Sequence, residues 1–94
     1  MEIIETKSKV SRPWSSDVKE YKNDDGDVVE RFLDVTTPNG IINVVSYNHG
    51  KDFAGTRLST VMNGYMYDRS FIGKFYSAQY CVTLADRFSS DLST

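Results

Sequence analysis

Apolar and polar residues alternate along most of this chain with the two-residue period of a β-strand. The alternation recurs in short segments separated by Asx-Gly pairs, which are typical of tight turns between neighbouring strands. We therefore expect strands over the ranges 2–10, 17–22, 27–36, 41–47, 57–62 and 65–69. Short turns between successive strands favour an antiparallel meander, in which the order in the sheet follows the order in the sequence.

Two kinds of turn connect these strands. The segments 23–26 (NDDG) and 37–40 (TPNG) have the form of a type I turn followed by a glycine in the left-handed region. The segment 63–64 (NG) is a two-residue hairpin loop, so we expect a positive φ at Gly64. This loop pairs six residues on one face of the sheet: Leu58 with Arg69, Thr60 with Tyr67 and Met62 with Tyr65. Val61 and Met66 then lie on the opposite face.

The hydrophobic period changes near the C-terminus. Over 71–88, spacings of four and three residues predict a helix, with Ser70 as its N-cap. One stripe of this helix should close the core: Phe71, Phe75, Ala78, Val82 and Ala85. A second stripe lies roughly opposite and is rich in aromatic residues: Tyr76, Tyr80 and Arg87, flanked by Ile72 and Leu84. The residues after the helix, 89–94, should fray.

These elements predict a single domain over residues 1–94 with an α+β fold. We expect an antiparallel β-meander of five to six strands, with one C-terminal α-helix packed on the sheet. The composition agrees, because valine, isoleucine and threonine far outnumber leucine and alanine. β-Branched side chains suit a pleated sheet better than a helix.

The composition also narrows the class of protein. One cysteine excludes an internal disulfide, and with a single histidine it argues against a structural zinc site. No apolar run is long enough to span a membrane, and we expect no signal peptide. We therefore expect a cytoplasmic protein that has no cofactor and no contact with a membrane.

Candidate chemistry is sparse. The segment 24–27 (DDGD) suggests a calcium loop, but the EF-hand register places Tyr21 and Phe32 at positions that require oxygen ligands. His49 is the one imidazole, in a loop with Asp52 or Arg57 as possible partners, and a small hydrolase is one alternative function. Because no second acid–base residue is placed by spacing, we expect no enzyme.

Two groups of residues predict binding surfaces instead. Tyrosine, methionine and arginine are enriched at protein interfaces, and they gather between positions 65 and 87. The candidate partner-binding residues there are Tyr65, Tyr67, Arg69, Tyr76, Tyr80 and Arg87. The second group is the turn Asp24, Asp25 and Asp27, which lies in a segment, 17–34, with seven acidic and three basic residues and a local charge of −4.

These surfaces favour a small non-catalytic binding protein that acts on a larger macromolecule. The acidic turn would attract a basic surface, such as the nucleic-acid groove of an enzyme. The sharpest hypothesis is a phage- or mobile-element-type inhibitor of a nucleic-acid enzyme or host defence complex, and homo-oligomers could form through the second helical stripe. A further alternative is single-stranded nucleic-acid binding through exposed aromatics such as Trp14 and Phe53, although a pI near 5.2 argues against it.

Overall fold

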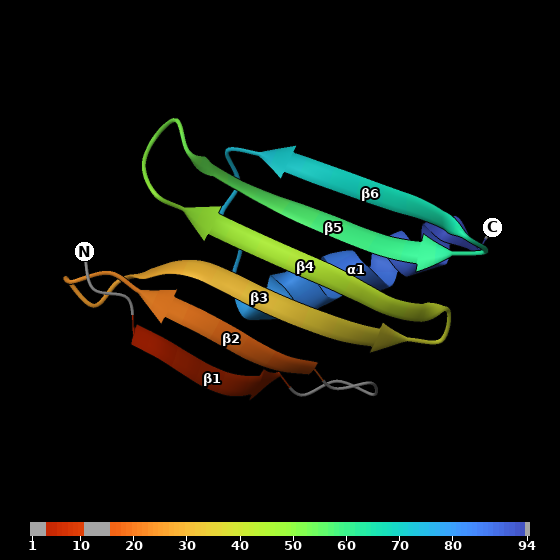
Figure 1. The fold of residues 1–94 in the computed structure, drawn as a ribbon, viewed down its shortest axis with the longest axis horizontal. Coiled ribbons are helices and arrows are strands. Elements are labelled where there is room, and N and C mark those ends of the chain that lie inside the picture. Colours follow the sequence, from red (N-terminus) through yellow and green to blue (C-terminus); the bar gives the residue numbers. More distant parts are fainter. Residues whose placement is uncertain (1–3, 11–15, 94) are drawn as a thin grey trace.

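Each strand of the protein pairs with the next strand along the chain. The computed structural model describes residues 4–10 and 16–93, and these residues contain one six-stranded antiparallel sheet in the order β1-β2-β3-β4-β5-β6 (Figure 1). The strands are β1 (Ile4–Val10), β2 (Ser16–Lys22), β3 (Val28–Thr37), β4 (Gly40–Asn48), β5 (Ala54–Met62) and β6 (Tyr65–Ile72). One helix, α1 (Ala78–Leu92), packs across one face, so the predicted α+β meander is confirmed.

The turns follow the predicted chemistry. Gly26, Gly40 and Gly64 all have positive φ, and at Gly64 the value is +81°. Asn63 is also left-handed, as a two-residue Asn-Gly hairpin loop requires. The hairpin pairs Met62 with Tyr65 and continues in the predicted register to the end of β6.

The helix begins later than its spacing predicts. The prediction placed it over 71–88 with Ser70 as N-cap, but α1 begins at Ala78 and ends at Leu92. The N-cap is Ser77, whose Oγ accepts a hydrogen bond from the backbone N–H of Tyr80 at 3.2 Å. This bond satisfies one of the N–H groups that a first helical turn leaves unpaired.

The first residues of the predicted helix belong to the sheet instead. Phe71 and Ile72 extend β6 and complete its pairing with β5. Gly73 follows with a φ of +78°, a left-handed conformation outside the α-helical region, and its N–H donates to the carbonyl of Ala54 at 2.8 Å. The ladder therefore satisfies the backbone here, and the spacing between Phe71 and Phe75 does not reflect a helix.

Buried polar contacts hold the connection between β6 and α1. The N–H of Tyr76 donates to Ser46 Oγ at 3.1 Å, and its carbonyl accepts from Arg31 Nη1 at 2.9 Å. Thr56 Oγ1 lies 2.7 Å from Ser46 Oγ and donates to the carbonyl of Lys74 at 2.8 Å. Because these partners come from β3, β4 and β5, the connection is tied to the middle of the sheet.

The core lies between α1 and the sheet. The sheet contributes the buried side chains Val18, Leu33, Val35, Ile42, Val44 and Leu58. The helix contributes Cys81, Val82, Leu84, Ala85 and Phe88. Val82 and Ala85 were predicted to face the core and do so, whereas Leu84 was placed on the opposite stripe and is in fact buried.

The C-terminal half of the helix is also better fixed than predicted. Ser89, expected to fray, is 3% exposed, and its Oγ lies 2.8 Å from Thr37 Oγ1. The side-chain amide of Asn39 donates to the Ser89 carbonyl at 3.3 Å. The β3–β4 turn therefore anchors the last turns of α1 and keeps that face of the sheet covered.

Some predictions fall on residues outside the described ranges. The candidate aromatic residue Trp14 is among them, as is the start of the first predicted strand at residue 2. Within the described ranges, no helix is long and apolar enough to cross a membrane.

Candidate binding surface

The two faces of the sheet differ in what covers them. Figure 1 looks onto one face with α1 behind the sheet, and no described segment lies over the near face, which we call the open face. Along β3, β4 and β5, residues on this face alternate with buried ones, for example Phe32 beside Leu33 and Asn43 beside Val44. The open face is therefore defined by the strand register.

Cross-strand pairing arranges the open face in four rows that run across the strands. The aromatic row lies toward the 48–54 loop and comprises Tyr21, Glu30, Tyr47, Gly55 and Ile72. Next is the cationic row, Lys19, Phe32, Val45, Arg57 and Ser70. The anionic row follows with Asp17, Asp34, Asn43, Ser59 and Asp68. The apolar row, at the other end, comprises Ile41, Val61 and Met66, with Thr36 beside Ile41.

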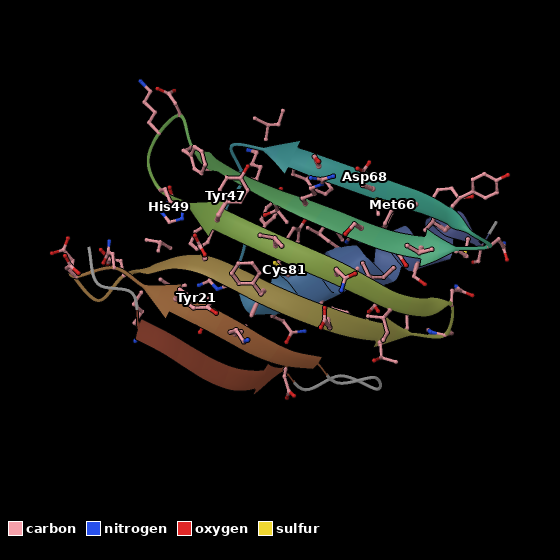
Figure 2. The ribbon with its side chains drawn as sticks, in the orientation of Figure 1. Tyr21, Tyr47, His49, Met66, Asp68 and Cys81 are labelled. Atoms are coloured by element: carbon pink, nitrogen blue, oxygen red, sulfur yellow. The ribbon has the colours of Figure 1, made fainter. Side chains whose placement is uncertain are left out.

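Large apolar side chains are exposed at both ends of this face. In the apolar row, Ile41 is 55%, Val61 66% and Met66 70% exposed. At the other end Ile72 is 92% exposed, and Phe53, which comes from the loop, is 62% exposed. Figure 2 shows Tyr47 and Met66 toward opposite ends of the sheet. The open face thus has two apolar ends separated by a polar band.

The polar band contains an ion pair and a hydrogen bond between an amide and a carboxylate. Arg57 Nη2 lies 3.1 Å from Asp68 Oδ2, between two side chains that are 60% and 52% exposed. The side-chain amide of Asn43 donates to Asp34 Oδ1 at 2.5 Å. Exposed pairs of this kind add little to stability, so they do not explain why the band is charged.

The aromatic row borders a shallow hollow of about 530 Å³ on the open face. Gly55 keeps it open: a Cβ at this position would lie 3.1 Å from the hydroxyl oxygen of Tyr47, so the phenol ring lies close over the glycine. The Tyr47 ring also contacts Phe53, with centroids 5.5 Å apart. On the open face the hollow is lined by Tyr47 and Ile72 together with the polar side chains Arg57, Asp68 and Ser70.

His49 pairs with a residue that spacing did not suggest. Its Nε2 lies 2.5 Å from Glu30 Oε2, whereas Asp52 or Arg57 was the expected partner. The His49 ring also lies edge-on to Phe53, 5.8 Å between centroids. Both members of the pair are partly exposed, 23% for His49 and 28% for Glu30. A carboxylate that orients an imidazole is one part of an acid–base site.

The acidic turn is exposed, as its turn chemistry predicts. Asn23 organises it, because its Oδ1 accepts the N–H groups of Asp25 at 2.9 Å and of Asp27 at 3.1 Å. Asp24, Asp25 and Asp27 are all exposed. They lie at the same end of the sheet as the aromatic row, since this turn joins β2 to β3 next to Tyr21 and Glu30.

Two of the predicted partner-binding residues lie on the covered side of the sheet. Tyr67 is half-buried and packs against the core. The Arg69 guanidinium lies 4.9 Å from the centre of the Phe88 ring and donates to Asp91 Oδ2 at 2.9 Å. These contacts give Tyr67 and Arg69 a role in holding α1 against β6.

The other predicted residues do not form one surface. Tyr65 is 69% exposed at the β5–β6 hairpin. The rings of Tyr76 and Tyr80 are tilted by 50° with centroids 4.6 Å apart; Tyr76 is partly buried against the core, and Tyr80 is 39% exposed. Arg87 is exposed two helical turns further along α1, about 10 Å away along the axis.

The cysteine belongs to the core. Cys81 is fully buried, and this burial raises the pKa of its thiol to about 11, against smaller lowering effects of Arg31 and Ser46. A thiol with a raised pKa is a poor nucleophile. Among the described residues, no group of three or more histidine, cysteine or acidic side chains could hold a metal ion.

Sequence reasoning found only part of the open face. It placed Val61 and Met66 on the face opposite Leu58 and Thr60, and the structure agrees. It missed Ile72, because that residue was assigned to a helix, and it missed the partnership of His49 with Glu30. The double-sided apolar pattern of β3, with Phe32 beside buried Leu33, is the signal that could have indicated a second surface.

Comparison with protein-family models, curated proteins and solved structures finds no match for this chain.

Proposed function

We propose that the protein is a non-catalytic binding protein that docks onto a protein partner through its open face. The observation behind this proposal is the exposure of Ile41, Phe53, Val61, Met66 and Ile72, each between 55% and 92%. Apolar side chains grouped on an uncovered sheet face and flanked by charges are typical of a protein interaction site.

The acidic turn favours a basic partner, because it adds three exposed carboxylates at one end of the open face. The open face itself carries both signs. Its described charged side chains are the cations Lys19 and Arg57 and the anions Asp17, Glu30, Asp34 and Asp68. A partner such as the nucleic-acid groove of a cytoplasmic enzyme would complement the acidic turn, and the protein would then act as an inhibitor of the phage or mobile-element type.

Single-stranded nucleic-acid binding is the second candidate. The rings of Tyr21 and Phe32 meet edge-on at 5.6 Å, and those of Tyr47 and Phe53 lie nearby on the same face, so bases could stack on them. The carboxylates of the same face would repel phosphates, which is why we rank this function below protein binding.

Hydrolysis through His49 is the weakest alternative. The contact with Glu30 favours it, since the carboxylate would orient the imidazole as a general base. The hollow beside the pair is small, about 240 Å³, and is lined mainly by rings and Val45. A His49→Ala variant that keeps full biological activity would exclude this function.

Site-specific photo-cross-linking in the source cell tests the main proposal. The photoreactive amino acid benzoylphenylalanine would replace Val61 on the open face or, as the matched control, Gln79 on the outer side of α1; both positions are exposed. We expect protein adducts from position 61 and few from position 79. Adducts from position 79 alone, or nucleic acid as the main adduct at position 61, would overturn the proposal.

A further inference from the structure

We propose that the open face binds the open face of a second copy of this chain. The two copies would be related by a two-fold axis that crosses the strands between the cationic row and the anionic row. This inference rests on the proposed role of the open face as a binding surface, and it names the partner.

The distribution of apolar residues is one argument. The aromatic row and the apolar row lie on opposite sides of the proposed axis, each two residue steps beyond its neighbouring charged row. A two-fold rotation about this axis therefore places the aromatic row of one copy on the apolar row of the other. Ile72, which is 92% exposed, would contact the second copy's Met66, which is 70% exposed. The two-fold axis makes this contact occur twice, so four apolar side chains would be buried in the dimer.

The distribution of charge is an independent argument. The same rotation keeps each strand over its counterpart, so that Lys19 faces the second copy's Asp17, and Arg57 faces Ser59 beside Asp68. An axis parallel to the strands, along β4, would instead place each row on its own copy and β2 on β6, so that Asp17 of one copy faces Asp68 of the other. Like charges in contact disfavour that arrangement, and the cross-strand axis is selected.

The geometry of sheets permits this pairing. Two sheets pack face to face about 10 Å apart with their strands within about 30° of each other. A rotation about an axis across the strands keeps the strands of the two copies aligned. The acidic turns would lie at opposite ends of the dimer, outside the paired faces, where they remain accessible to a basic partner.

Paired cysteines test this arrangement. Met66 and Ile72 both lie on β6, six residues and therefore about 20 Å apart along the strand. A bismaleimide with a shorter reach cannot join these positions within one chain. The variant Met66→Cys/Ile72→Cys can then be cross-linked only between copies, and the native Cys81 stays silent because it is buried.

We expect a covalent dimer from the double variant and from an equal mixture of the two single variants, but not from either single variant alone. The control is Ser90→Cys combined with Ile72→Cys, which adds a thiol on the outer side of α1 and should not cross-link. Circular dichroism checks that each variant folds.

Two other outcomes would overturn the inference. If the single variants cross-link as well as the double variant, the copies meet in another register or at random. If no covalent dimer forms while position 61 still captures a different protein in the cell, self-pairing is wrong and the proposed binding function stands. If position 61 captures nothing either, both proposals fail.

Discussion

The two faces of the same sheet use apolar residues for different purposes. On the covered face, Val35, Val44 and Leu58 are at most 1% exposed, because α1 lies over them. On the open face, Ile41 and Val61 come from two of the same strands and are 55% and 66% exposed. Folding accounts for the first group, since burial stabilises it. It does not account for the second group, for which we propose a role in binding.

The polar residues of the two faces differ in the same way. Ser46 and Thr56 are buried on the covered face, and each hydroxyl is within hydrogen-bonding distance of a defined partner. Arg57 and Asp68 form an exposed pair on the open face. Substitutions that are matched across the two faces should therefore separate the contributions to folding from those to binding.

The largest difference in unfolding free energy between the two faces should come from the same valine-to-aspartate change made on each. Val82 is fully buried, so Val82→Asp places a carboxylate in the core and should cost about 3–5 kcal/mol of unfolding free energy. Val61→Asp should cost less than about 0.5 kcal/mol, since its site is open to water. Urea unfolding of both variants measures the difference, and equal costs would remove the distinction between the faces.

The burial of Cys81 on the covered face should make the free energy of unfolding depend on pH. Burial raises its pKa from 9.0 to about 11, so the folded state holds the thiol proton more tightly than the unfolded state. The stabilisation that the protonated thiol gives to the folded state is complete below pH 9. It decreases by about 2–3 kcal/mol as the pH rises toward 11. Cys81→Ala should lose less stability over this range than the wild type. Parallel pH profiles for the two proteins would contradict the assigned burial.

A smaller effect should come from serine-to-alanine changes on the two faces. Ser46→Ala removes the acceptor of the Tyr76 N–H and the hydroxyl partner of Thr56, so it should cost about 1–3 kcal/mol. Ser59→Ala, on the open face, should be nearly neutral. Thermal unfolding compares the two variants, and a neutral Ser46→Ala would show that the connection before α1 does not depend on this contact.

The acidic turn should affect association more than folding. Replacing Asp24, Asp25 and Asp27 by Asn keeps the turn propensity and removes three exposed negative charges, so stability should change by less than about 0.5 kcal/mol. Association with a basic protein should slow, and the difference should shrink as salt screens charges beyond about 10 Å. Stopped-flow mixing at several salt concentrations measures this. Tighter binding to an oligonucleotide would point to the nucleic-acid alternative instead.

The sequence predicted the sheet better than the site because turns are local and surfaces are not. Asn63 and Gly64 are sufficient to set the register of their hairpin, and the strand order follows from such turns. The start of the helix depends on the pairing of Phe71 with Thr56, fifteen residues away. Hydrophobic periodicity alone cannot reveal such a contact. The contact between Glu30 and His49 likewise arises only from the pairing of β3 with β4.

The most direct test of the open face as a contact surface is a methyl NMR dilution series. The account predicts that the methyl signals of Ile41, Val61 and Ile72 shift or broaden as the protein concentration rises. The methyl signals of Ala78 and Thr83 on α1 should stay in place. Constant signals from the open face across the whole series, or changes confined to α1, would contradict the pairing of two open faces.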